Sequence, residues 1–451
     1  MLGVALAVSG LSLASPSFND PTNDPVGGVP LLIHAERVIV RPGVELENQD
    51  VLIHDGVIVS VGEGLAAPEG AREISGQVVC AGFLDPWSSL GVDAGSARDE
   101  STSASTRTVD ALDRYGAEQH LEDALRAGVT TVRVQAGGRA VIGGLGAVVR
   151  LDPSVDASRA VVLGDASQAA SVGLPRAGRQ RDIFDRVGEV GRLAGMLEKG
   201  RKYDEDWTEY RYELEEWQKA ITEKEEELEK DFKKAKKDRD KEIEKAKEKG
   251  KEFKEERYKE ESKPRRPKFD EDSAAMARVA GGEVPLVVEV HRYEEIRTLL
   301  DQTAAFDRLR LVIAGATEAA HHAKELARRN IPVIVWPKPM GPAGDEWDGH
   351  DLGLAGALGE AGVEVLIGSG GSDTARELRL LAALAVSHGL EREAALRSIS
   401  LGAAEAFDVD DRLGSVERGK DADLLVLSGD PLDSTARIQF VISQGRVVVE
   451  Q

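Results

Sequence analysis

Three side chains that could bind a metal ion lie at or after the ends of predicted apolar strands in the second half of the chain. Glu289 and His291 lie two residues apart, and side chains alternate along a strand, so the two share one face. Asp373 follows the apolar run 365–368 and a short glycine-rich segment. Carboxylates and imidazoles bind zinc, and bound zinc lowers the pKa of a water molecule for hydrolysis. A metal-assisted hydrolytic site is therefore one hypothesis.

Each of these residues also has an interpretation that needs no metal. Glu289 and His291 could form a charged pair with Arg292 at the rim of a strand. Asp373 precedes a predicted helix that starts at Thr374, and aspartate is a favoured N-cap residue. The residue types alone leave both interpretations open.

Between residues 77 and 406, apolar strands alternate with helical patterns, which is typical of βα units around a parallel sheet. The run 78–85 predicts the first strand, and residues 121–134 predict a helix, a glycine C-cap at Gly128 and a second strand. Later strands are predicted at 284–290, 310–314, 331–336 and 364–368. A closed barrel is the simplest architecture with this alternation. Residues 31–76 and 407–451 instead predict short strands and tight turns.

Three segments are similar to motifs of the amidohydrolase superfamily, in its imidazolonepropionase-related branch. Residues 81–91 resemble the family's P-G-[FL]-I-D-x-H-x-H-x-G, with Trp87 and Ser89 at the two histidine positions. Residues 121–133 resemble A-L-x-A-G-V-T-T-V-R, and residues 414–424 resemble G-x-[LV]-x-x-G-K-x-A-D-[LF]. The resemblance implies an α/β fold: a (β/α)8 TIM-like barrel at 77–198 and 269–406, and a small composite β-sandwich built from both termini, at 31–76 and 407–451.

The resemblance also implies where metal ligands would stand. The family uses the two histidines after the first strand, single histidines after two middle strands, and an aspartate after the last strand. Trp87, Ser89, Glu289 and Gly370 occupy former ligand positions. An indole N–H only donates, and a neutral serine hydroxyl is a weak ligand. The metal-binding motif is thus degenerate, and the catalytic residues are unknown, with Asp373 as a candidate.

Two functional hypotheses follow. The favoured one is a catalytically lapsed amidohydrolase-like protein that acts by binding, for example as the partner of an active paralogue. For this protein we expect no cofactor. The alternative is an active hydrolase of C–N bonds in non-peptide or small-peptide substrates, with zinc held by Glu289, His291 and Asp373 in a rearranged single-metal site.

Residues 199–268 form a Lys/Glu-rich helical insertion that is foreign to a barrel. Apolar residues recur in steps of three and four at Trp207, Tyr210, Leu214, Trp217 and Ile221, which is the seam of a coiled coil. We expect either a packed or partner-bound arm or a solvated charged helix. This seam suggests two partners: a second copy of the chain, or a paralogous amidohydrolase.

Composition excludes other classes of function. The 451 residues have a formal net charge of -22, which disfavours nucleic acid as a partner. The apolar stretch 2–14 is too short to span a membrane and ends in Ser12-Leu13-Ala14, small residues at the positions that signal peptidase recognises. We expect residues 1–14 to be a signal peptide and the protein to be exported, to the periplasm or the medium. The single cysteine, Cys80, excludes an intrachain disulfide.

Overall fold

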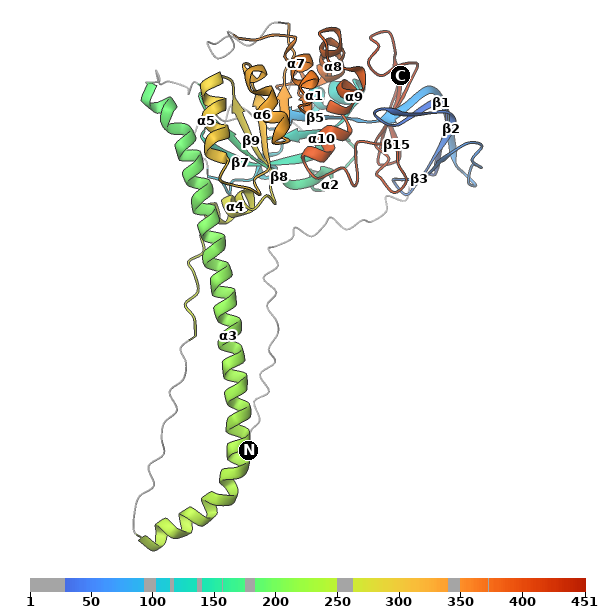
Figure 1. Cartoon of the computed structure of the whole chain (residues 1–451). Helices are drawn as coiled ribbons and strands as arrows, with labels where there is room; N and C mark the ends of the chain where they lie inside the picture. Colours follow the sequence, from blue (N-terminus) through green and yellow to red (C-terminus); the bar gives the residue numbers. More distant parts are fainter. Residues whose placement is uncertain are drawn as a thin grey trace.

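The computed structural model describes residues 29–92, 103–113, 117–135, 140–155, 157–174, 183–249, 263–339, 349–371 and 373–451. The predicted signal peptide lies outside these residues. Two sheets form the body of the molecule, helices surround one of them, and one very long helix projects away from both (Figure 1).

The larger sheet has eight strands in the order β5 to β12 and is a nearly closed barrel. Its strands are β5 (Phe83–Ser88), β6 (Val129–Val134), β7 (Ile142–Arg150), β8 (Val161–Ser171), β9 (Leu286–Val290), β10 (Leu311–Gly315), β11 (Val333–Val335) and β12 (Val365–Ile367). The described ladders do not join β12 to β5. The two ends still meet, because the N–H of Gly370 donates to the carbonyl oxygen of Trp87 at 3.2 Å.

One strand of this barrel departs from the expected βα alternation. β7 is antiparallel to both β6 and β8, and no helix of the described residues separates it from β6. Its glycines admit close neighbours, since a Cβ at Gly144 would lie 2.4 Å from the carbonyl oxygen of Thr106. Glycine here permits strand packing rather than a turn.

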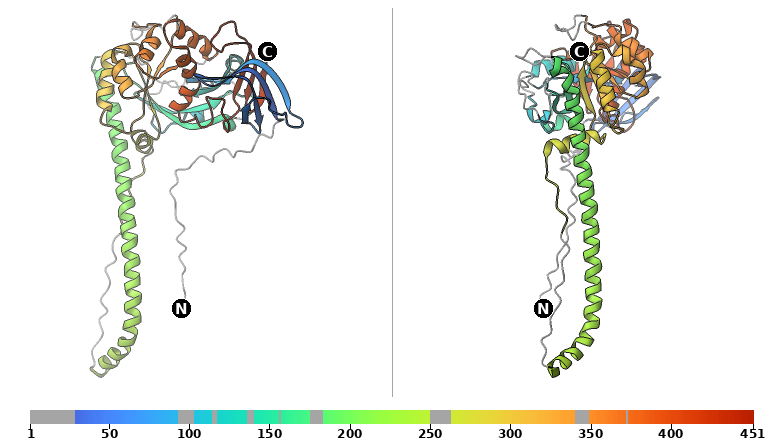
Figure 2. Two further views of the ribbon diagram at one scale, coloured as in Figure 1. Left: turned by 45° about the vertical axis from the view of Figure 1, so that its right-hand side comes forward. Right: turned by 60° about the vertical axis from the view of Figure 1, so that its left-hand side comes forward.

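Helices pack around the outside of the barrel (Figures 1 and 2). They are α1 (Glu118–Arg126), α2 (Ala157–Ala160), α4 (Glu271–Ala280), α5 (Tyr293–Thr303), α6 (Ala323–Arg328), α7 (Leu354–Glu360), α8 (Leu378–Ser387), α9 (Arg392–Ser398) and α10 (Leu401–Ala406), with 3-10 turns η1 (Thr108–Ala111), η2 (Ala319–His322) and η4 (Ala375–Glu377). Inside the barrel, a separate apolar cluster includes Leu84, Val287, Ile334, Leu366 and Phe407. The barrel is therefore a packed core and not a pore.

The second sheet combines both ends of the chain, as expected for the composite domain. It has seven strands in the order β15-β14-β13-β4-β1-β2-β3. The strands are β1 (Leu31–Arg41), β2 (Val44–His54), β3 (Val57–Gly62), β4 (Arg72–Ala81), β13 (Leu424–Leu427), β14 (Ile438–Ser443) and β15 (Arg446–Glu450). The expected strand 78–85 is in fact two strands. Residues up to Ala81 belong to β4 of this sheet, and the barrel strand β5 starts after Gly82.

A buried ion-pair network joins the two sheets. Arg150, at the end of β7, is 1% exposed, and its Nε donates to Asp423 at 2.8 Å while its Nη2 pairs with Asp421. Both aspartates belong to the Lys-Asp-Ala-Asp segment that precedes β13. Burial acts to lower the pKa of Arg150, but the charges of Asp423 and Asp421 outweigh it and raise that pKa.

Helix α3 (Ile183–Lys249) is the long projection, and its 67 residues correspond to about 100 Å. It begins well before the charged insertion, because its first turns pack on the barrel through buried Val190, Leu193 and Leu197. Gly200 lies against α4, since a Cβ there would be 2.4 Å from the backbone of Met276. Beyond this point the helix leaves the body of the molecule (Figure 2). In the described part of the chain, we find no helix with both the length and the apolar character to cross a bilayer.

Replacing Arg150 by leucine is expected to destabilise the protein by about 3–5 kcal/mol, because Asp421 and Asp423 would lose the cation that compensates their burial. Urea unfolding followed by circular dichroism measures the change. The control is Arg72→Leu, which removes an ion pair with Glu450 whose side chains are 45% and 62% exposed, and should change stability little. Equal effects of the two substitutions would contradict a joining role for Arg150.

Candidate functional site

Aromatic rings fill the end of the barrel where the carboxyl ends of the strands meet. Trp87, on β5, and Trp336, directly after β11, are 9% and 7% exposed, and their ring centroids lie 5.2 Å apart. The imidazole of His291, after β9, lies 6.0 Å from the Trp336 ring. Catalytic residues of barrel enzymes gather at this end. Here the corresponding space contains two packed indoles.

Glycines at two strand ends make room for these rings. A Cβ at Gly315, the last residue of β10, would lie 2.3 Å from Cε1 of His291. A Cβ at Gly368, directly after β12, would lie 2.8 Å from the Cβ of Trp87. Any larger residue at either position would have to displace a ring or the backbone. The rings and glycines therefore form one closely packed arrangement.

Arg133, which projects from β6, places a buried positive charge against these rings. Its guanidinium carbon lies 5.5 Å from the Trp87 ring and 5.0 Å from the Phe407 ring, within the range of cation–π attraction. Its Nε donates to Ser167 at 2.8 Å, and its Nη2 donates to Gln135 at 2.6 Å. Burial lowers the pKa of Arg133 to about 9, and the charge of Asp85 opposes this shift. Arg133 therefore remains charged at neutral pH.

Asp85, on β5, supplies a buried carboxyl beside this cation. Its Oδ1 accepts from the backbone N–H of Trp87 at 3.1 Å and from that of Ser369 at 3.0 Å, which joins the ends of β5 and β12. Its Oδ2 has no hydrogen-bond partner among the described residues. Burial raises the pKa of Asp85 to about 6, against the lowering effect of the hydrogen bonds from Ser369 and Trp87.

Gly370, at the expected aspartate position, lies next to Trp87 and adopts a φ of +73°, in the left-handed region. A Cβ there would be 3.3 Å from Nζ of Lys338 and 3.3 Å from the Trp336 ring. Burial lowers the pKa of Lys338, and its ammonium donates to Thr374 at 3.3 Å. A lysine therefore points to the place that a residue-370 carboxylate would occupy.

Glu289 and His291 lie together, as the alternation along β9 predicted. Nε2 of His291 is 3.6 Å from Oε1 of Glu289, and Nδ1 of His291 hydrogen-bonds Thr317 at 2.6 Å. The ion pair that we expected between Glu289 and Arg292 is absent from the described residues. These two ligand-type side chains are neighbours, but a third is needed for a metal site.

Asp373 is exposed, and the N-cap interpretation of it is wrong. The turn η4 begins after Thr374, and no side chain caps it. The hydroxyl of Thr374 donates instead to the carbonyl oxygen of Ser369 at 2.9 Å, which fixes the loop without Asp373. Ser89 is half-buried after β5. Within the described ranges, no three His, Cys, Asp or Glu side chains are grouped as a metal site.

The sequence interpretation missed Asp85, Arg133, Trp336 and Lys338 as members of this cluster. Arg133 had one available signal, since it is the charged residue in the otherwise uncharged strand Val-Thr-Thr-Val-Arg-Val. A charge placed in a strand that is buried along its whole length must have a local partner.

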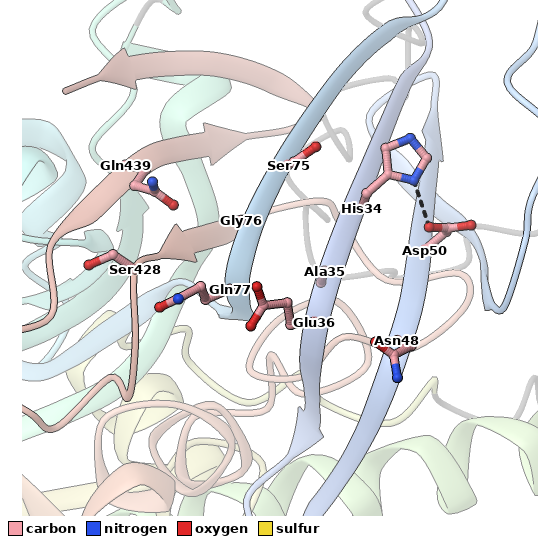
Figure 3. A pocket seen from close by; sticks show the side chains of 10 residues that line it. All are labelled: His34, Ala35, Glu36, Asn48, Asp50, Ser75, Gly76, Gln77, Ser428 and Gln439. Atoms are coloured by element: carbon pink, nitrogen blue, oxygen red, sulfur yellow. Dashed lines mark hydrogen bonds and ion pairs between the residues drawn. The ribbon is translucent and has the colours of Figure 1, made fainter.

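A separate groove of about 670 Å³ lies on the second sheet (Figure 3). Polar side chains from several of its strands line it, among them His34, Asp50, Gln77 and Gln439. His34 Nδ1 is 2.7 Å from Asp50, and hydrogen bonds to Asp50 and Glu73 raise the pKa of His34. None of the residues of the barrel cluster lines this groove.

Replacing Asp85 by asparagine is expected to weaken the pH dependence of stability between about pH 4 and pH 6. Folding raises the pKa of Asp85 from 3.8 to about 6, so the folded state holds the proton more tightly. The associated stabilisation is complete below about pH 4 and is lost as the pH rises through 6. Urea unfolding across this range should therefore show a larger loss for the parent than for Asp85→Asn. Parallel curves would mean that Asp85 does not titrate with the shifted pKa.

Comparisons with known proteins agree with this architecture. Among solved structures, an amidohydrolase from Thermotoga maritima MSB8 aligns with a TM-score of 0.71 at 24% identity, over 93% of this chain and 100% of that one. A prolidase complexed with N-methylphosphonate-L-proline aligns with a TM-score of 0.54 at 16% identity, over 94% and 100%. At these identities the likeness establishes the fold alone.

Sequence comparisons identify the family. A dihydroorotase from Citrifermentans bemidjiense (strain ATCC BAA-1014 / DSM 16622 / JCM 12645 / Bem) is 50% identical over 58 residues, which are 12% of this chain and only 13% of the dihydroorotase. The model of the amidohydrolase family matches residues 88–449, which is most of the chain. The chain therefore belongs to the amidohydrolase family.

Proposed function

We propose that this chain is a catalytically lapsed amidohydrolase that acts by binding, in a lineage related to imidazolonepropionase. The observation that carries the proposal is the packing of Trp87. At the first former ligand position, an indole is buried against Trp336 and Arg133. A side chain so placed fills space next to the strand ends and offers no lone pair to a metal.

The donor set does not fit a zinc site of the family. Trp87, Ser89 and Gly370 supply no carboxylate, imidazole or thiolate, which are the side chains that bind zinc in proteins. Glu289 and His291 remain as a pair, and His291 already hydrogen-bonds Thr317. We therefore derive no hydrolytic step through a metal.

The positive charges in the cluster also disfavour a bound divalent metal ion. Arg133 is buried and remains protonated at neutral pH, and Lys338 lies beside Gly370. Two fixed cations near the former ligand positions repel a divalent cation at short range, where the surrounding protein screens charge less than water does. Asp85, with its pKa raised to about 6, compensates for only one of them.

A second candidate function has one specific observation in its favour. Glu289 and His291 are 3.6 Å apart and could hold one zinc ion with a third ligand, for which Asp373 was the candidate. Such an enzyme would hydrolyse C–N bonds in non-peptide substrates or small peptides. The names of the dihydroorotase and the prolidase are compatible with that substrate class.

The parent protein is expected to bind well under one zinc ion per chain, and the triple variant Trp87→His, Ser89→His, Gly370→Asp is expected to bind more tightly, because three ligands then converge near Glu289. Isothermal titration with zinc measures both. Loss of the Trp87 ring could cost about 3–5 kcal/mol, so folding is checked by circular dichroism.

The structure supplies a matched control for this titration. A carboxylate at position 370 would lie close to Lys338 and could pair with it instead of zinc, so the triple variant is compared with and without Lys338→Met. Parent protein that retains one or two zinc equivalents after desalting would overturn the lapsed-site proposal. A folded variant that binds no more zinc than the parent would show that these residues do not stand at former ligand positions.

We further propose that the protein is exported, on the basis of the apolar stretch 2–14 and its small C-terminal residues. The chain expressed with residues 1–14 in place, in a bacterium that exports proteins, is expected to mature near Ser15. N-terminal sequencing of the protein from the periplasmic or medium fraction measures this. Intact residues 1–14 on protein that remains in the cytoplasm would contradict export.

A further inference from the structure

In the sequence of α3 beyond Gly200, apolar residues recur at helical spacing. With 100° between successive residues, Trp207, Leu214 and Ile221 lie in line, and the sequence continues the same stripe at Leu228, Phe232 and Ile243. Tyr212 lies on the opposite side of the helix and is 66% exposed. A helix this long depends on packing of its apolar face for stability.

The segment that returns to the barrel, residues 263–268, covers the part of the stripe nearest the barrel. The guanidinium of Arg266 stacks on Trp207 at 5.2 Å, and the ammonium of Lys263 stacks on Trp217 at 5.7 Å. Trp207 is 9% exposed as a result. In the sequence, the apolar spacing continues beyond Ile221 toward the end of the helix.

Charge is distributed unequally along the same helix. Residues 204–229 contain twelve Asp or Glu and three Lys or Arg, whereas residues 230–249 contain ten Lys or Arg and six Asp or Glu. We call these the acidic half and the basic half of the arm. The return segment 263–268 adds four basic residues beside the acidic half, which still leaves that half negative.

We propose that two copies of this chain pair through their arms, side by side and antiparallel. In that orientation the acidic half of each arm faces the basic half of the other, and the two apolar stripes form one seam. The contact is the same from either copy, as a two-fold symmetric interface requires. A parallel pair would place acidic against acidic and basic against basic, which is unfavourable along the entire seam.

The first experiment measures association. Light scattering coupled to gel filtration of the full chain is expected to give twice the mass of the chain at micromolar concentration. Ile221→Glu, Leu228→Glu and Phe232→Glu together, on the stripe, are expected to weaken dimerisation by at least tenfold. The control is Tyr212→Glu, which introduces one such charge on the exposed face and should leave the dimer intact.

A deletion variant keeps the proposal testable if the arm variant with Ile221→Glu, Leu228→Glu and Phe232→Glu does not fold. Because Lys263 lies over the Trp217 ring, residues 218–262 can be replaced by a short Gly/Ser linker without stretching the chain. This variant is expected to be a folded monomer. A deletion variant that still dimerises would place the contact elsewhere and overturn the proposal, as would a parent protein that is monomeric at high micromolar concentration.

The second experiment measures orientation. Cys80 is buried and burial raises the pKa of its thiol to about 12, so cysteines introduced on the arm can be labelled selectively. One preparation has a fluorescent donor attached at Glu209→Cys, and another has a fluorescent acceptor attached at Glu248→Cys. The two labels are expected to show efficient energy transfer after the preparations are mixed. Donor and acceptor both on Glu248→Cys should show little transfer. The reverse result would mean parallel arms and would overturn the antiparallel assignment.

Discussion

A buried guanidinium, that of Arg150, lies at the junction of the two sheets. A buried arginine is costly unless carboxylates compensate it, and the carboxylates in reach are Asp421 and Asp423, at the start of β13. Asp423 also accepts the N–H of Gln444 at 2.8 Å, which fixes the following hairpin. The start of β13 and the end of β7 are thus held together by a buried ion pair.

A second buried charge, Arg133, lies at the end of the barrel where the catalytic residues of barrel enzymes gather. A metal site combines a concentrated positive charge with several ligands and an opening for substrate. Here a guanidinium between two aromatic rings supplies the positive charge, and a carboxyl with a raised pKa lies beside it. Asp85 compensates for the charge of Arg133, and the two rings stabilise the same guanidinium. The indole of Trp87 is thus part of the core at this end of the barrel.

Local sequence patterns predicted much of this fold. Apolar alternation located most barrel strands, and the Lys-Asp-Ala-Asp segment correctly indicated the terminal sheet. The break between β4 and β5 was missed, because residues 77–84 form one apolar run and the turn depends on contacts of Gly82, where a Cβ would lie 2.2 Å from Thr130. The partners of Arg133 and Arg150 were also beyond prediction. Burial decides their roles, and Asp423 is 273 positions from Arg150 in the chain.

Helix α3 connects two distant places by a rigid element. Near its start, Glu189 is 1% exposed and accepts the N–H of Gly173 at 2.8 Å, directly after β8 ends. The other end of the helix lies far outside the body of the molecule (Figure 1). A long helix behaves as a lever: with roughly 70 Å of helix beyond its last barrel contact, a tilt of about 5° at the base displaces the far end by up to about 6 Å. Rearrangements at the end of β8 that are too small to alter the barrel would thus be magnified into displacements on the scale of a side chain.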